Sequence, residues 1–283
     1  MNQRYPVLQR TALSAVGAVY SRTMSISPSR DFYPEFPATV TEVVDLTPSF
    51  RRVRIAAPEL ATVERLGPDE YIGVYMPPVG KPLRLPAPAL MPRGPLGKIP
   101  EAERPELRWY TIRAQEPGSG TIDVDVVATG HDGPGSRWIE RVAAGDEVGV
   151  RVQTAPYGSA PAAGHHVLLA DETALPAMLA ILDAHRDDPD RRFTAILEVP
   201  SMDLVTDEVD ADEITIVVRG DDAPGTALLA ALPGADLDGA DYGWVCAEAA
   251  AAAGGRRHLV KERGMDRRSI MFTGYWKVGR ARL

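Results

Sequence analysis

The stretch RWYTIR, residues 108 to 113, places two large aromatic side chains between arginines, directly after a proline-rich segment. As a fully buried strand this composition is unfavourable, because each guanidinium taken out of water needs a partner. As a strand that faces a ligand it is reasonable, since it offers a planar ring, a hydroxyl and cations side by side. We therefore expect a ligand-facing strand that presents Arg108, Tyr110, Thr111 and Arg113.

The residues around this stretch predict a β-rich domain. Apolar and polar residues alternate in TVTEVVDL, FRRVRIAA, EYIGVYMP and TIDVDVVA, with turn residues between the runs. This pattern is typical of antiparallel strands in a barrel or sandwich. Residues 77–106 hold many prolines, so we predict a long loop without regular structure there.

From about Pro161 the pattern changes. HHVLLA, RFTAILEV, EITIVVRG, YGWVCA and SIMFTGYW are predicted strands, and TALPAMLAILDAH, TALLAAL and residues 248–263 are predicted helices. Strands that alternate with helices predict a parallel sheet with covered faces. The expected organisation is an N-terminal extension (1–36), an antiparallel β-barrel domain (37–160) and an α/β domain (161–283).

Composition excludes several functional classes. The 283 residues are 45% hydrophobic, and a net charge of −8 argues against a general nucleic-acid binder. The single cysteine, Cys246, rules out an intramolecular disulfide, and the histidines show no metal-ligand spacing. No apolar run is long enough for membrane insertion, and no convincing signal-peptide cleavage site follows residues 7–24, so we expect a cytoplasmic protein.

A glycine-rich turn, GPGS, occupies residues 133–136. We predict a helix from about Arg137 to Ala143 with Ser136 at its N-cap. Because a helix start offers free backbone N–H groups and a positive dipole end, Gly133 and Ser136 are candidate contacts for a pyrophosphate. The alternative is that Ser136 is only a cap.

Two predicted strand ends in the second half carry further candidates. ADETALP follows an apolar strand, so Thr173 lies where backbone N–H groups can meet an anion or an amide, while Asp171 would repel a phosphate. The alternative for this turn is a solvated acidic cap. Cys246 and Glu248 end a later strand at the same sheet edge, and for Cys246 the better interpretation is a core residue. Glu198, at another strand end, either favours the free ribose of NADH or is solvated.

The C-terminal GYWKVGR gathers aromatic and cationic side chains within six residues, namely Tyr275, Trp276, Lys277 and Arg280. An exposed aromatic beside cations suits an anionic iron chelate. The alternative is an ordinary packed strand with a solvated tail.

Taken in order, R-x-Y-T-x-R, G-P-x-S-x-W, D-E-T-A-L-P, W-x-x-x-E and G-Y-W form a series that resembles the siderophore-interacting protein family of FAD-containing ferric-siderophore reductases. This family belongs to the ferredoxin-reductase-like flavoproteins. The resemblance runs from about Thr39 to Arg280 and implies a flavin-binding antiparallel β-barrel followed by an NAD(P)H-binding-like α/β domain.

The resemblance also implies site residues. The isoalloxazine and ribityl contacts would be Arg108, Tyr110, Thr111 and Arg113. The pyrophosphate contacts would be Gly133, Ser136 and Trp138, with Thr129 and Gly130 at the family's preceding His-Gly. The nicotinamide side would include Asp171, Thr173, Cys246 and Glu248. The chelate would meet Tyr275, Trp276, Lys277 and Arg280.

The implied function is electron transfer from NADH or NADPH through FAD to a ferric siderophore, with release of Fe(II). No catalytic side chain is needed, because the cofactor carries the chemistry. The donor stays open among NADH, NADPH and a ferredoxin, and the oligomeric state is not predicted. Two alternatives remain: a reductase with a quinone, free flavin or partner protein as acceptor, and a non-catalytic siderophore-binding module.

This chain departs from the family pattern at four positions. Thr129 replaces the family's histidine, and Gly73 stands where many members have a lysine that would hold the siderophore. Ala170 and Ala247 replace glycines in the second domain. A thinner cationic pocket slightly favours a different acceptor.

Overall fold

The computed structural model describes residues 23–128 and 133–279. The first half of this chain forms a seven-stranded antiparallel sheet in the order β4-β3-β7-β1-β2-β6-β5. Its strands are β1 (Glu35–Thr47), β2 (Phe50–Ala56), β3 (Tyr71–Met76), β4 (Glu106–Thr111), β5 (Ala114–Glu116), β6 (Thr121–Val127) and β7 (Glu147–Val152).

The sheet closes into a barrel because its two edge strands follow one another directly. Only Ile112 and Arg113 separate β4, at one edge, from β5, at the other. The backbone N–H of Arg113, just after β4, donates to the carbonyl of Asp123 in β6 at 2.8 Å, which joins the end of one edge strand to the strand beside the other edge. Fully buried valines and isoleucines, such as Val53 and Ile72, fill the interior.

The proline-rich segment contains more regular structure than expected. It forms a short helix, α2 (Arg93–Leu96), and a 3-10 turn, η2 (Glu101–Glu103), so the prediction of a loop without regular structure is wrong at these two places. The fully buried Arg151 pairs with Glu35 and donates to the carbonyl of Leu90 at 2.9 Å. This arginine therefore fixes the segment against the barrel.

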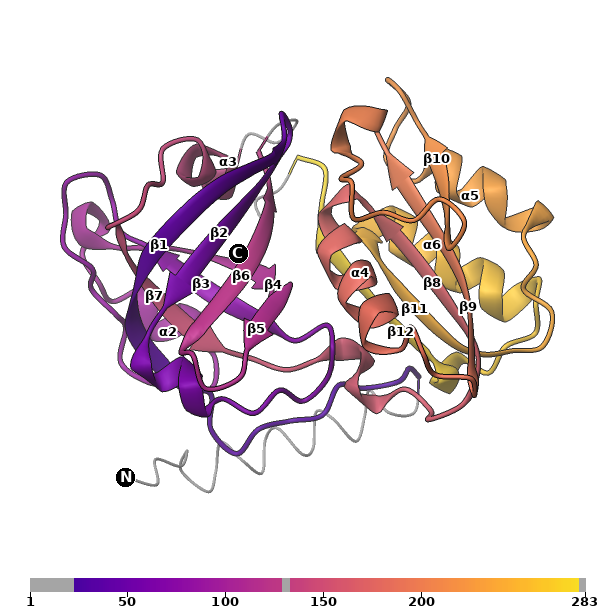
Figure 1. Cartoon of the computed structure of the whole chain (residues 1–283), viewed down its shortest axis with the longest axis horizontal. Helices are drawn as coiled ribbons and strands as arrows, with labels where there is room; N and C mark the ends of the chain where they lie inside the picture. The colour runs from indigo at the N-terminus through magenta and orange to yellow at the C-terminus, as the bar shows by residue number, and fades with distance from the viewer. Residues whose placement is uncertain (1–22, 129–132, 280–283) are drawn as a thin grey trace.

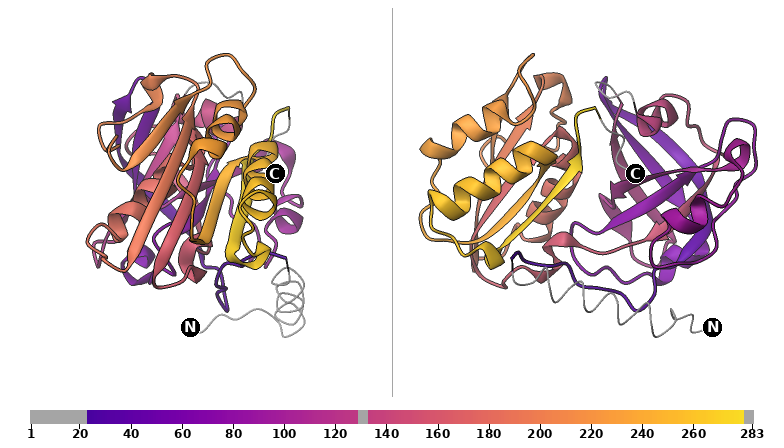
Figure 2. Two further views of the ribbon diagram at one scale, coloured as in Figure 1. Left: turned by 90° about the vertical axis from the view of Figure 1, so that its right-hand side faces the viewer. Right: turned by 180° about the vertical axis from the view of Figure 1, so that it is seen from behind.

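The second half forms a five-stranded parallel sheet in the order β10-β9-β8-β11-β12. Its strands are β8 (Gly164–Asp171), β9 (Arg191–Val199), β10 (Ile214–Val218), β11 (Ala240–Glu248) and β12 (Ile270–Trp276). Helix α4 (Leu175–Ala184) covers the face toward the barrel, and α5 (Thr226–Ala231) and α6 (Ala249–Lys261) cover the far face (Figures 1 and 2). Neighbouring residues of β8 point to opposite faces of the sheet. Leu168 therefore packs in the core under α4, and Leu169 packs in the core under α5 and α6.

The predicted fold class, an antiparallel barrel followed by an α/β domain, is confirmed. The first sheet ends at Val152 and the second begins at Gly164. The domain limits 37–160 and 161–283 stay a prediction.

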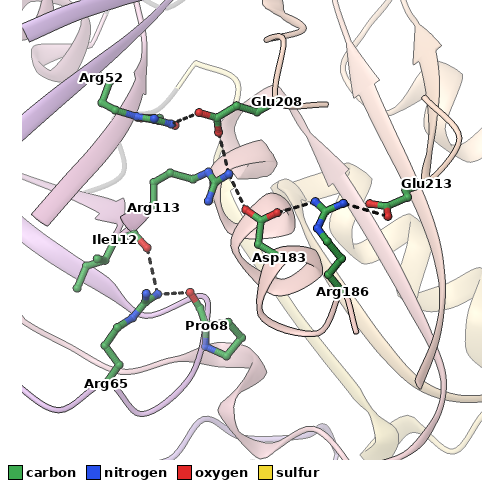
Figure 3. A network of polar contacts seen from close by, with 10 residues as sticks. Arg52, Arg65, Pro68, Ile112, Arg113, Asp183, Arg186, Glu208 and Glu213 are labelled. Atoms are coloured by element: carbon green, nitrogen blue, oxygen red, sulfur yellow. Dashed lines mark hydrogen bonds and ion pairs between the residues drawn. The ribbon is translucent and has the colours of Figure 1, made fainter. Parts of the chain in front are cut away.

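The two sheets are joined through side chains. Phe50, at the start of β2, is buried in the same core as Leu175 and Met178 of α4. Beside this apolar contact runs a chain of ion pairs (Figure 3). Glu208 binds Arg52 at 2.8 Å and Arg113 at 2.7 Å.

Candidate functional site

Strand β4 and helix α3 (Pro134–Ile139) come together as the sequence predicts. Arg108 and Tyr110 share a face of β4, because they pair with Val74 and Ile72 of the barrel interior. The ring of Tyr110 lies 6.0 Å from that of Trp138. Burial raises the pKa of Tyr110 above its usual range, so its hydroxyl stays a neutral hydrogen-bond donor at ordinary pH.

Two glycines at the start of α3 leave room for other groups close to the backbone. A Cβ on Gly135 would lie 2.6 Å from the Tyr110 hydroxyl and 3.7 Å from Cγ of Arg108, so only glycine fits there without a shift. Among the described residues, a Cβ on Gly133 would meet nothing within 4 Å. The first backbone N–H groups of the helix therefore border open space beside an arginine, which suits an anionic group.

The predicted capping role of Ser136 is wrong. Helix α3 starts at Pro134, with Gly133 as the N-cap, and no side chain caps it. Proline is favoured at the first helical position because its fixed φ suits the helix and it has no N–H to satisfy, which moves the start ahead of the serine. Ser136 instead lies inside the helix, and it is buried.

The other residues of the predicted flavin set, apart from Trp138 beside Tyr110, lie away from the start of α3 or outside the described residues. Thr111 is buried on the opposite face of β4, opposite Tyr71. Arg113 extends toward the second domain and contacts Asp183 and Glu208, both at 2.7 Å. Trp138 is a core residue. Thr129 and Gly130 lie outside the described residues.

The second group of predicted residues meets at the carboxyl edge of the parallel sheet. Asp171, at the end of β8, accepts from the backbone N–H of Thr173 at 3.0 Å and from its hydroxyl at 2.6 Å. Its other oxygen accepts from the N–H of Glu248 at 2.6 Å and from the indole N–H of Trp276 at 2.8 Å. One buried carboxylate thus joins the ends of β8, β11 and β12.

The protonation of Asp171 is shifted by its surroundings. Burial, and then the charge of neighbouring Glu172, raise its pKa to about 6, against the lowering effect of its hydrogen bonds. This carboxylate is 1% exposed, so it cannot offer much surface to a ligand.

The other candidates of the second domain have distinct positions. Glu248 caps α6 by accepting from the N–H of Ala251 at 3.3 Å and from that of Ala250 at 2.5 Å. Cys246 is fully buried in the core under α4, which favours its interpretation as a core residue. Lys277 is exposed. Arg280 lies outside the described residues.

Neither interpretation of Glu198 is correct. The side chain is fully buried and accepts from the N–H groups of Gly225 at 2.6 Å and Leu228 at 2.8 Å, so it caps α5. Arg219 lies 3.4 Å away and also binds Glu172 at 2.8 and 2.9 Å. A carboxylate held in this way is not available to a ribose.

The barrel and the second domain meet in an apolar core. Val127, at the end of β6, packs against the cluster that includes Ala174 and Leu175, where η4 (Glu172–Ala174) is followed by α4. Two surface hollows of about 460 and 490 Å³ lie elsewhere, one around Asp238 and Arg263 and the other around Gln115.

The described residues contain neither a metal-binding cluster nor a membrane-spanning helix. Within residues 23–128 and 133–279, no cluster of three or more His, Cys, Asp or Glu side chains could hold a metal ion. Over the same described ranges, no helix has the length and apolar character needed to cross a membrane.

Sequence reasoning missed two residues that shape the candidate areas. Gly135 is not among the predicted contacts, which include only Gly133 and Ser136 of the GPGS turn. A second glycine in so short a turn is nevertheless a signal that another group approaches the backbone closely. Asp69 had no signal, because its partners Tyr157 and Trp244 are far away in the sequence.

Comparison with known proteins gives matches to both halves. A family model described as "Siderophore-interacting FAD-binding domain" matches residues 39–159, and one described as "Siderophore-interacting protein" matches residues 163–279. An uncharacterised protein of Mycobacterium tuberculosis is 32% identical over 213 residues, which is 70% of this chain and 73% of that protein.

A crystal structure of a siderophore utilization protein from T. fusca is 28% identical, with a TM-score of 0.70 over 91% of this chain and 97% of that one. The ferric vibriobactin reductase ViuB of Vibrio cholerae is 26% identical over 182 residues, covering 62% of this chain and 66% of ViuB.

Proposed function

Because the chain belongs to the siderophore-interacting protein family, with that family's FAD-binding domain in its first half, we propose that it is an FAD-dependent ferric-siderophore reductase. In this proposal NADH or NADPH is the electron donor and a ferric siderophore is the acceptor. The similarity to ViuB, which is named as a ferric vibriobactin reductase, supports the choice of reaction.

The observation that carries the proposal is the contact between Tyr110 and Gly135. The phenol of one strand lies against a glycine of a helix start, with Arg108 beside both. A flavin dinucleotide needs a planar partner for its ring system and N–H donors and a cation for its diphosphate. These residues fit that group.

Each residue has a defined task in this proposal. Arg108 and the backbone N–H groups at the start of α3 would hold the diphosphate, and Tyr110 would hold the ring system through its face and its neutral hydroxyl. Bound FAD would supply the redox chemistry, taking a hydride from NAD(P)H and delivering its two electrons singly to ferric iron. Thr173 and the end of β12 would border the nicotinamide, and Lys277 would attract the anionic chelate.

The experiment is an anaerobic titration of the purified protein, loaded with FAD, with NADH and separately with NADPH. We expect loss of the flavin absorbance with one or both, followed by rapid recovery when a ferric siderophore is added. A protein that cannot be loaded with FAD would contradict the proposal and favour the non-catalytic binding module. In a second outcome, every ferric chelate reoxidises the reduced flavin no faster than dioxygen does. This result would contradict a ferric siderophore as the acceptor.

One observation favours a different acceptor as the second candidate. The indole of Trp109 lies over Gly73, where a Cβ would be 2.7 Å from the ring. An aromatic ring therefore occupies the place where many family members carry a lysine. A quinone or another planar, less anionic acceptor would suit this surface, and stopped-flow reoxidation with quinones and ferric chelates side by side separates the two cases.

A further inference from the structure

The end of β12 departs from regular pairing in a way that redirects one side chain. Ala247 pairs with Gly274, but the next residue, Glu248, pairs with Trp276, so Tyr275 is an extra residue in the strand. A Cβ on Gly274 would lie 2.8 Å from Cα of Ala249, and glycine therefore allows the strand to approach the start of α6. Such bulges commonly re-aim a side chain.

The re-aimed residue is Trp276, and its indole N–H reaches the buried Asp171 at 2.8 Å across the end of β11. A second contact follows two residues later, where the N–H of Val278 donates to Glu248 at 3.3 Å. Tyr275, the residue before Trp276, lies edge-on to Trp244 with ring centroids 6.5 Å apart. The segment after β12 is therefore held by two acidic residues of the sheet edge.

A simple capping role explains only half of the contacts of Asp171. The oxygen that accepts from Thr173 completes the local turn. The other oxygen accepts, among the described residues, from Glu248 and Trp276 of two later strands. Since a carboxylate fully supplied with donors is costly to rearrange, these bonds fix the position of the indole.

We propose that Asp171 is a positioning residue, which holds the indole of Trp276, and with it the segment that carries Tyr275 and Lys277, over the carboxyl edge where the nicotinamide is expected. Its task is to keep this segment in place while it makes no direct contact with the ligand. The functional part of this inference rests on the proposed reductase activity, whereas the tether itself does not.

The test uses the full chain labelled with 15N-tryptophan, so that four indole N–H signals are observed, one for each tryptophan. The variant Trp276→Phe assigns one signal to Trp276. We expect its hydrogen exchange to be at least about tenfold faster in Asp171→Asn than in the unsubstituted protein, because an amide offers one acceptor oxygen where the carboxylate offers two. The matched control is Glu198→Gln, which changes an equally buried strand-end carboxylate that does not contact Trp276.

The second measurement is the rate of flavin reduction by NADH or NADPH, followed by stopped flow. Asp171→Asn and Trp276→Phe should each slow this step at least about tenfold, and the double variant should be no slower than the worse single one. Reoxidation of the chemically reduced flavin by dioxygen, which needs neither the nicotinamide nor the chelate contacts, should stay within about twofold of the unsubstituted protein.

Unchanged exchange of the Trp276 indole in Asp171→Asn would overturn the tether, as would equal acceleration in Glu198→Gln. Losses in flavin reduction that add in the double variant would overturn the positioning role. If Asp171→Asn does not fold, the rate of flavin reduction in Trp276→Phe tests the positioning role by itself. A normal rate in this variant would contradict the proposal. If the unsubstituted protein is not reduced by any nicotinamide, the reductase function fails, but the exchange measurement still judges the tether.

Discussion

Trp244, inside the parallel sheet, donates its indole N–H at 3.0 Å to the carboxylate of Asp69, which lies 175 residues earlier in the barrel half of the chain. The same carboxylate accepts from the backbone N–H of Tyr157 at 2.9 and 3.0 Å. Asp69 and Trp244 are both fully buried. A single acidic side chain thus links the barrel, the connecting segment and the second sheet.

This link predicts a pH-dependent stability. Burial raises the pKa of Asp69 from 3.8 to about 7, more than its hydrogen bonds lower it. Since the folded state holds the proton that the unfolded chain releases above about pH 4, the free energy of unfolding should fall as the pH rises toward 7 and level off above it. The contribution has an upper limit of about 4 kcal/mol.

The measurement is urea unfolding between pH 5 and 8 for the unsubstituted protein and Asp69→Asn. The asparagine variant lacks the titrating group, so the difference between the two proteins should change with pH. A constant difference over this range would show that Asp69 does not titrate there. The comparison also removes the effect of His166, whose pKa is lowered by burial in both proteins.

The ion pairs of Arg113 predict a salt-sensitive interdomain contact. Asp183→Asn and Glu208→Gln should each lower the free energy of unfolding by about 1 kcal/mol or less, because both carboxylates are partly exposed. The difference should shrink in high salt, which screens the pairs. The matched control is Asp266→Asn, which breaks the exposed pair with Arg268 inside one domain. An equal salt effect in all three variants would mean that the interdomain pairs have no special role.

The contact between Gly73 and Trp109 predicts a compensating pair. Gly73→Ala should lower the free energy of unfolding by about 1–3 kcal/mol, because the new methyl group meets the indole at 2.7 Å. In a protein that already carries Trp109→Ala, Gly73→Ala should lower the free energy of unfolding by clearly less. In the same protein, Gly73→Lys should strengthen the binding of an anionic ferric chelate. Thermal and urea unfolding of the four proteins measure the coupling. Additive losses would mean that the indole does not restrict position 73.

Local patterns in the sequence were sufficient to predict the fold. The alternation around Val53 and the strand-helix alternation after Pro161 depend on neighbouring residues, and both indicate the correct sheets. The burial of Glu198 could not be predicted in this way, because a charged residue at a strand end looks solvated until its distant partner, Arg219, is known. The hydrogen bond between Asp69 and Trp244 likewise depends on how the two sheets meet.

The error at Ser136 has a different origin. Serine is a good N-cap, but the preceding Pro134 is better suited to the first helical position than to the turn before it. The preference of Ser136 for the N-cap and that of Pro134 for the first helical position therefore predict different starts for α3. The helix starts at Pro134, because proline restricts the backbone and serine does not.

The flavin site itself can be tested by two glycines that differ only in their surroundings. Gly133 has a φ of −90°, and an added Cβ would meet no atom of the described residues within 4 Å. Gly133→Ala should therefore leave the free energy of unfolding of the FAD-free protein within about 0.5 kcal/mol. If the diphosphate approaches this residue, the added methyl group should weaken FAD binding at least about tenfold. Gly135→Ala should reduce both stability and FAD binding, because its methyl group meets the Tyr110 hydroxyl at 2.6 Å.

Fluorescence titration with FAD and urea unfolding measure the two effects separately. Gly94→Ala is the control, since Gly94 also has free space around it and lies in α2, in the proline-rich segment. Because Gly133→Ala adds no contact with the described residues of the FAD-free protein, weaker FAD binding in this variant at unchanged stability would indicate a contact with the ligand. Unchanged FAD affinity in Gly133→Ala would move the diphosphate away from the start of α3, even if the protein binds FAD elsewhere.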